Sequence, residues 1–164
     1  FNINQKDRIG RTPLFYARCS VELTGYLLEH GADVNLYKGT LTYAVETRRT
    51  EIVRLLLRHG AVPNRECFHR AIHRGNAEIL SILLEHHPLA ADLEHHKPDF
   101  GPTILNRFLM SGDVPTETKL SISRILIEHG SASSTAVSFM HRSLEYAVTV
   151  KRVVCCEILL QAGA

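Results

Sequence analysis

One amphipathic pattern recurs along this chain of 164 residues, and it limits the folds that the chain can adopt. Its clearest copy reads T-E-I-V-R-L-L-L-R-H-G-A and occupies residues 50–61. Related copies occupy residues 21–32, 77–87, 119–131 and 153–164. Each copy predicts an amphipathic helix that ends at or near a glycine. One such helix cannot bury its apolar side alone, so the sequence predicts that the copies stack on one another.

Composition narrows the class of protein further. Apolar residues make up 45% of the chain and charged residues 22%, which is typical of a folded domain and not of a disordered chain. The 19 lysines and arginines nearly balance the 17 aspartates and glutamates, so net charge does not indicate a nucleic-acid partner. No run of about 18 apolar residues predicts a membrane span. The cysteines lack metal-binding spacing and predict reduced thiols in a cytoplasmic or nuclear protein; they are Cys19, Cys67, Cys155 and Cys156.

Two segments resemble the ankyrin repeat. Residues 7–17 read D-R-I-G-R-T-P-L-F-Y-A, and residues 31–35 read G-A-D-V-N. In that family a turn, an inner helix opening T-P-L-H-x-A, an outer helix ending L-L-x-x-G and an extended finger form a repeat of about 33 residues. The resemblance implies an all-α solenoid of about five helix-turn-helix repeats. The inner-helix alanine position is held by Ala17, Ala44, Ala71, Phe108 and Ala147, and the outer-helix end by Gly31, Gly60, His87, Gly130 and Gly163.

The spacing of these positions predicts one ankyrin-repeat domain over residues 1–164. Its repeats are expected at about 5–36, 37–64, 65–98, 99–134 and 135–164. The first inner-helix alanines are only 27 residues apart, so the fingers are predicted to be shortened. An insertion is expected near residues 111–116, and a long connection at 88–102. The sequence starts and stops at the same point of the repeat and carries no polar capping repeat, so we expect a fragment of a longer array.

The motif residues have predictable structural roles. Thr12 is placed to cap the first inner helix, and Pro13 suits its first turn. The glycines are expected to end the outer helices in the left-handed conformation. An apolar triplet in each outer helix is expected to form the shared core. The triplets are residues 26–28, 55–57, 82–84, 125–127 and 158–160.

Catalytic and metal-binding patterns are weak. Four of the ten histidines fall at one repeat position near the end of an outer helix, where an imidazole can bond to free carbonyls; they are His30, His59, His86 and His129. No nucleophile elbow, dinucleotide fingerprint or phosphate loop is present. The sequence therefore predicts no enzyme activity, no metal and no cofactor.

Residues aligned by repeat position indicate a candidate binding surface. In ankyrin proteins the fingers and inner helices form the concave face on which partners usually dock, and the resemblance implies the same face here. Carried onto this chain, that face holds Arg11, Tyr16, Lys38, Tyr43, Arg65, Arg70, His73, Arg74 and Arg107. The outer helices are richer in glutamate. Arginine and tyrosine are typical anchors of protein interfaces, and a basic face favours an acidic partner.

These patterns predict a non-catalytic protein–protein interaction module, monomeric as a domain, that acts as an adaptor or scaffold. Its partner is a protein or peptide, with an acidic one favoured, and no membrane is involved. One alternative is a regulatory or substrate-recruiting arm of an enzyme elsewhere in a longer protein. Nucleic-acid binding is disfavoured, because glutamates alternate with the arginines. The resemblance also places Asn4, Asn35 and Asn64 at the tail asparagine that asparaginyl hydroxylases modify in some ankyrin proteins.

Overall fold

A computed structural model describes residues 2–87, 104–111, 114–130, 134–149 and 151–163. The side chains of residues 104, 107, 130 and 134–140 lie outside the described part. The chain divides into two compact units, residues 1–70 and 71–164, and each is described by itself. The described residues form helices and no strand, which confirms the predicted all-α class.

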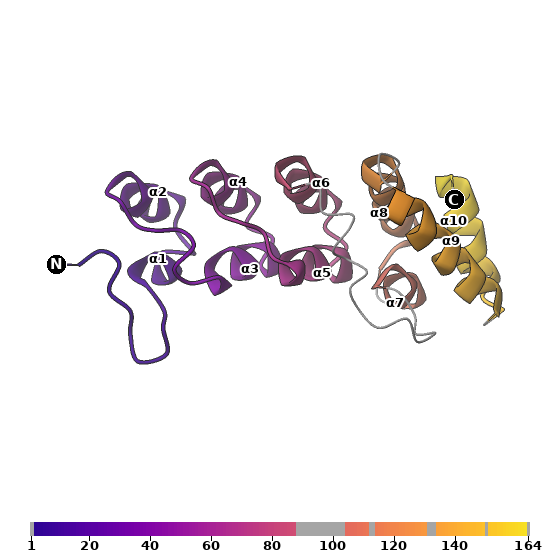
Figure 1. Cartoon of the computed structure of the whole chain (residues 1–164), viewed down its shortest axis with the longest axis horizontal. Helices are drawn as coiled ribbons and strands as arrows, with labels where there is room; N and C mark the ends of the chain where they lie inside the picture. Colours follow the sequence, from indigo (N-terminus) through magenta and orange to yellow (C-terminus); the bar gives the residue numbers. More distant parts are fainter. Residues whose placement is uncertain (1, 88–103, 112–113, 131–133, 150, 164) are drawn as a thin grey trace. The chain divides into compact units, whose positions relative to one another are not determined.

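The N-terminal unit is built in two layers of helices (Figure 1). The inner layer holds α1 and α3, which contact each other, and the outer layer holds α2 and α4, which also contact each other. Each outer helix follows and packs on the inner helix of its own pair. A further helix, α5, begins in this unit. The helix bounds are α1 Pro13–Tyr16, α2 Val21–Glu29, α3 Gly39–Glu46, α4 Thr50–Arg58 and α5 Arg65–His73.

The outer helices end as the motif predicts. Gly31, with φ 88°, lets the N–H of Ala32 donate to the carbonyl of Leu27 at 2.9 Å. Gly60, with φ 83°, closes α4 in the same way. The left-handed residue satisfies carbonyls that the end of a helix would otherwise leave unpaired, and glycine adopts it without steric cost.

The core of the N-terminal unit lies between the two layers. It contains Leu14, Ala17, Ala44, Val53 and Leu56, each 2% exposed or less. The prediction that whole triplets form the core is wrong for the first outer helix, because Tyr26 is 56% exposed while Leu28 is buried. Each triplet spans too wide an arc of the helix for all three side chains to face one neighbour.

Thr12 does not cap α1 as predicted. It occupies the position before the helix, but its side chain makes no capping hydrogen bond, and its Oγ1 is buried without a partner. Ser20 instead caps α2, where its Oγ accepts a hydrogen bond from the backbone N–H of Leu23 at 3.1 Å. Asn64 acts in the same way at the start of α5, accepting from the N–H of Cys67 at 3.1 Å. These side chains pair donors that the first turn of a helix leaves free.

The C-terminal unit repeats the layered arrangement. Helix α8 packs against α6, α7, α9 and α10, and α7 packs against α9 and α10. Its core includes Leu83, Leu105, Ile122 and Leu159. The last triplet departs from the prediction, because Leu160 is 60% exposed. The helix bounds are α6 Ala77–His86, α7 Ile104–Met110, α8 Thr116–Gly130, α9 Ser134–Thr149 and α10 Val153–Ala162.

Helix ends in this unit follow the glycine prediction only in part. Gly163 closes α10 with φ 101°, as expected. His87 follows α6 with an extended backbone at φ −148°, and Gly130 is the last residue of α8. The predicted insertion falls between α7 and α8, where residues 112–113 lie outside the described residues. The whole predicted connection at 88–102 also lies outside them. The repeat boundaries and the expected longer array stay predictions.

Candidate protein-binding surface

The finger that precedes α1 is held by the carboxylate of Asp7. Its Oδ1 accepts the backbone N–H groups of Ile9, at 3.0 Å, and of Arg11, at 2.8 Å. Its Oδ2 accepts Nε of Arg11 at 2.8 Å and the hydroxyl of Tyr16 at 2.7 Å. Gly10 completes the turn with φ 82°. One side chain thus fixes both the loop and two residues of the predicted surface.

These bonds set the charge state of Asp7. Partial burial acts to raise its pKa, but the hydrogen bonds from Tyr16, from the Arg11 side chain and from two backbone N–H groups outweigh it. They hold the pKa well below the usual range of an aspartate. The carboxylate in turn raises the pKa of Tyr16, chiefly through their hydrogen bond. Arg11 is therefore paired within the chain across the ordinary pH range.

Aromatic rings and guanidinium groups gather behind this finger. The ring of Phe15 meets the rings of Tyr37 at 4.9 Å and Tyr43 at 6.1 Å between centroids, both edge to face. The Cζ of Arg18 lies 4.1 Å from the centroid of Phe15 and 4.4 Å from that of Tyr43. The Cζ of Arg11 lies 4.9 Å from the centroid of Tyr16. Rings from α1 and α3 and the segment between α2 and α3 thus meet in one cluster.

The other basic residues of this unit differ in their pairing. Lys38 precedes α3 and Arg65 begins α5, and both are exposed. Arg70 instead donates to Glu66 at 2.6 Å and to Glu46 at 2.9 Å. Its side chain is about two-fifths exposed, so these contacts are screened by water. Lys38 and Arg65, in contrast, are both exposed.

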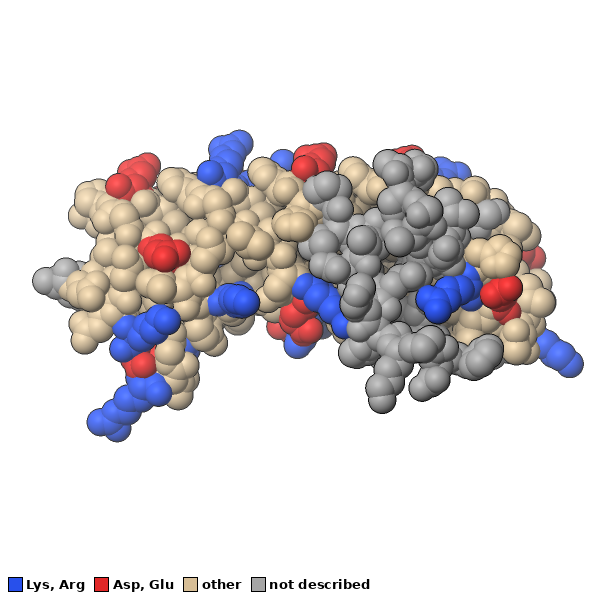
Figure 2. Space-filling view, viewed as in Figure 1, with Lys and Arg blue, Asp and Glu red and all other residues tan. Residues whose placement is uncertain are grey.

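We call Arg11, Tyr16, Lys38, Tyr43, Arg65 and Arg70 the N-terminal inner surface. Acidic and basic side chains alternate over the described residues rather than forming one basic patch (Figure 2). The carboxylates of Asp7, Glu46 and Glu66 reduce the positive charge that the sequence predicts for this surface. Its role in binding stays a prediction.

The remaining predicted site residues lie at the end of α5, just after it, or within α7. His73 and Arg74 are exposed in the C-terminal unit. Arg107 is part of α7, but its side chain lies outside the described residues.

The tail asparagines connect one repeat to the next. Asn4 Nδ2 donates to the carbonyl of Gly31 at 3.0 Å, and its Oδ1 accepts the N–H of Asp33 at 2.8 Å. Asn35 forms the same two bonds to Gly60, at 2.8 Å, and Val62, at 3.0 Å. Each amide thus bonds backbone groups at the end of the following outer helix. These contacts give the asparagines a structural role and do not test the hydroxylation that the resemblance implies.

Sequence reasoning missed four members of this region: Asp7, Phe15, Arg18 and Tyr37. For Asp7 a signal was present, because Asp7 and Gly10 bracket a four-residue turn with a side chain that commonly bonds its own backbone. No such signal exists for Phe15 and Arg18, because the later copies carry other residue types at the same repeat positions.

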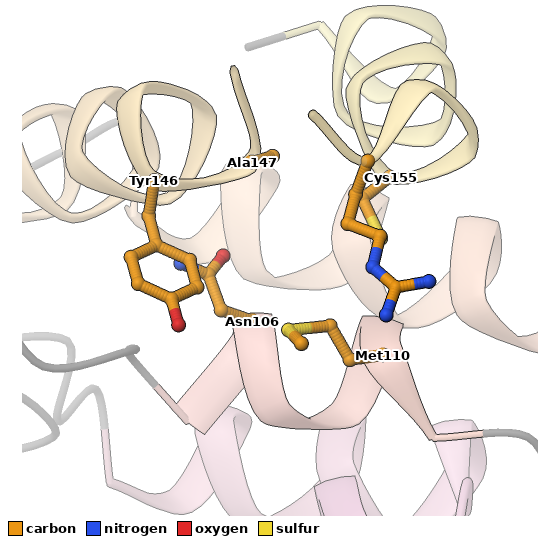
Figure 3. A pocket seen from close by; sticks show the side chains of 6 residues that line it. Asn106, Met110, Tyr146, Ala147 and Cys155 are labelled. Atoms are coloured by element: carbon orange, nitrogen blue, oxygen red, sulfur yellow. The ribbon is translucent and has the colours of Figure 1, made fainter. Parts of the chain in front are cut away.

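The C-terminal unit contains a small pocket, lined in part by Asn106, Met110, Tyr146 and Cys155 (Figure 3). Asn106 and Met110 come from α7, Tyr146 from α9 and Cys155 from α10. These side chains leave no room for even a water molecule, whereas a typical ligand pocket has roughly 300–1,000 Å³. Burial also raises the pKa of the Cys155 thiol, which makes it a poor nucleophile. The pocket does not compete with the N-terminal inner surface as a site.

Within the described part of the chain, no group of three or more histidine, cysteine, aspartate or glutamate side chains is placed to hold a metal ion. No helix among those residues is both long and apolar enough to cross a membrane. All four cysteines are free thiols.

Comparison with known proteins places this arrangement in a family. A family model described as ankyrin repeats (3 copies) matches residues 1–67. The crystal structure of EF0377, an ankyrin repeat protein, is similar with a TM-score of 0.66 and 25% sequence identity. The match covers 98% of this chain and 85% of that one. The finger, the paired helices and the glycine closures are therefore those of an ankyrin-repeat solenoid.

Proposed function

Residues 1–67 match ankyrin repeats and the fold is that of an ankyrin-repeat solenoid, and on that basis we propose that the chain is a non-catalytic adaptor or scaffold that binds a partner protein or peptide. Ankyrin repeats generally act as protein–protein interaction modules. The partner docks on the N-terminal inner surface, and its docking segment is acidic. Recruitment of that segment to a larger assembly is the task we assign to the chain.

One observation supports this surface above others: it carries both exposed cations and partly exposed aromatic rings. Lys38 and Arg65 are open to solvent, Tyr16 is 53% exposed, and Tyr43 is half-buried. Aromatic rings supply contact area at low entropic cost, while nearby cations guide an acidic segment during encounter. The internal carboxylates argue against a nucleic-acid ligand, since they repel a chain of phosphates.

The test uses a fluorescein-labelled pool of 12-residue peptides in which glutamate alternates with randomised uncharged residues. Binding to the whole chain is measured by fluorescence anisotropy. The double variant Lys38→Glu/Arg65→Glu is expected to weaken binding about tenfold or more. Arg11 stays unchanged, because reversing its charge would set a second carboxylate against Asp7 and disturb the finger.

A matched control separates this surface from general attraction. Arg58→Glu makes the same change of charge as Arg65→Glu, at an exposed residue in the last turn of the outer helix α4. It is expected to leave binding within about twofold of the parent. Equal losses from Arg58→Glu and Arg65→Glu would contradict the assignment of the surface. Tighter binding of an oligouridylate, lost steeply with added salt, would favour the nucleic-acid alternative instead.

A further inference from the structure

Three partly buried arginines of the N-terminal unit differ in what neutralises them. Arg11 is paired with Asp7, and Arg70 is paired with Glu46 and Glu66. Arg18 has no carboxylate partner among the described residues. A partly buried guanidinium is usually paired or hydrogen-bonded, because removing it from water is costly. Arg18 is therefore the exception that calls for a physical explanation.

Two aromatic rings lie against the Arg18 guanidinium, on adjacent sides of it rather than on opposite faces. Phe15 of α1 lies 4.1 Å and Tyr43 of α3 lies 4.4 Å from Cζ. Such stacking stabilises the cation and fixes the plane of the guanidinium. A further hydrogen-bonding partner must approach along the edge of the group, where the N–H bonds point.

One nitrogen of the guanidinium has a hydrogen-bond partner, and the other two have none within the described residues. Nη1 donates to the backbone carbonyl of Phe15 at 2.8 Å. Nε is buried and has no hydrogen-bond partner, and Nη2 also lacks one within the described residues. Unlike Nε, Nη2 is not enclosed. Nη2 is therefore the donor that a carboxylate oxygen can reach from outside, and a charge-assisted hydrogen bond to it would neutralise the cation.

We propose that Arg18 is the anchor that binds a glutamate or aspartate carboxylate of the acidic partner segment. Phe15 and Tyr43 hold the guanidinium in place, and the partner's carboxylate supplies the ion pair that Asp7 and Glu46 supply to Arg11 and Arg70. A single guanidinium carries one positive charge, which suits a carboxylate better than a doubly charged phosphate. This inference rests on the proposed function and names the residue on which the specificity of that surface depends.

The first test needs no variant of the protein. Because Nε of Arg18 is buried, its N–H exchanges slowly with water and gives a resolved ¹⁵N–¹H signal. That signal is expected to shift saturably when N-acetyl-glutamate N-methylamide is titrated in. The matched glutamine compound is expected to leave it unmoved. If Arg18 only donates a hydrogen bond to the Phe15 carbonyl, its signal will respond to neither compound. That result would overturn the assignment.

The second test measures specificity. Two pools of 12-residue peptides differ only in a central glutamate or glutamine, with the same randomised flanks. The parent chain is expected to prefer the glutamate pool about tenfold or more. Arg18→Gln is expected to abolish the preference, and Arg18→Lys to lose most of it, because an ammonium keeps the charge but not the fork. Circular dichroism melts of both variants identify any loss caused by unfolding, in which case the signal of the parent's Arg18 decides.

The outcomes separate this inference from the proposed function. If Lys38→Glu/Arg65→Glu weakens both pools but the parent shows no preference for glutamate, the binding surface stands and the Arg18 anchor is wrong. If neither pool binds while the Arg18 signal shifts with the glutamate compound, the anchor stands and the proposed function is wrong. A larger shift with inorganic phosphate than with the carboxylate would overturn the carboxylate assignment.

Discussion

The first two helix pairs of the chain share one motif but differ in how far their outer helices are buried. In α4 the side chain of Ile52 is 1% exposed, whereas Leu23, at the same repeat position in α2, is 49% exposed. Leu55 of α4 lies on the flank that faces α2, since its Cδ2 is 3.8 Å from a Cβ built on Gly25. The equivalent flank of α2 carries Leu23 and Tyr26, and no outer helix precedes it among the described residues.

The first pair has an extensive set of polar contacts in its finger. Its inner helix α1 has only four residues, and its finger is held by the four hydrogen bonds of Asp7. The second pair has an eight-residue inner helix and a shorter finger, in which the carboxylate of Asp33 accepts the N–H of Asn35 at 2.8 Å. Among the described residues, the first pair thus relies more on its finger and the second more on its buried outer helix. The expected effects of substitution differ accordingly.

The largest effect is expected inside α4. Leu56 is fully buried, and Leu56→Ala removes its packing and leaves a cavity. The expected loss is about 2–5 kcal/mol of unfolding free energy, measured by urea denaturation. The matched change in α2 is Leu27→Ala, at a half-buried side chain, and it should cost clearly less. Equal losses at the two positions would contradict the difference in cover between the two helices.

The asparagine bridges should have intermediate effects. Asn35→Ala removes the bonds to Gly60 and Val62 and is expected to cost about 1–2 kcal/mol, as two hydrogen bonds near the surface typically do. Asn35→Asp keeps the acceptor but sets a carboxylate against the Gly60 carbonyl, so it should not restore stability. Asn4→Ala removes the same pair of bonds at the first pair and tests whether the bridge has equal strength there.

Much of this fold was predictable from the sequence, because its determinants are local. Glycine at positions 31 and 60 indicates where the outer helices end, and the structure confirms both. The inner helix α3 ends with the same backbone geometry at Arg48, φ 57°, and α9 is followed by Lys151 at φ 54°. No residue type signals these ends, since packing imposes a conformation that neither side chain favours.

The candidate site was less predictable, because it depends on contacts between repeats. Arg18 packs against a ring three residues before it and a ring 25 residues after it. Alignment by repeat position identifies residues that recur, such as Arg11 and Lys38, and passes over a cluster that occurs once. It also cannot show that Arg70 is neutralised, because Glu46 belongs to the preceding inner helix.

Acid should loosen the first pair through Asp7. The folded chain holds the pKa of Asp7 below its value in the unfolded chain, which is about 3.9. The contribution of Asp7 to stability is therefore complete above the unfolded pKa and is lost as the pH falls through the lower folded pKa. Asp7→Asn should flatten the dependence of stability on pH below about 4, as measured by thermal melts in a pH series. An unchanged acid limb in Asp7→Asn would show that other carboxylates determine it.

The smallest effect is expected on the open flank of α2. Leu23→Ala removes a side chain that is half exposed, so the free energy of unfolding should change by no more than about 0.5 kcal/mol. Ile52→Ala is the matched change at the covered position and should cost about 2–5 kcal/mol. The ratio of these two losses measures directly how far a neighbouring outer helix determines whether one motif position is core or surface. A loss above about 1 kcal/mol for Leu23→Ala would mean that this flank is covered in solution, and the distinction between the two helix pairs would then fail.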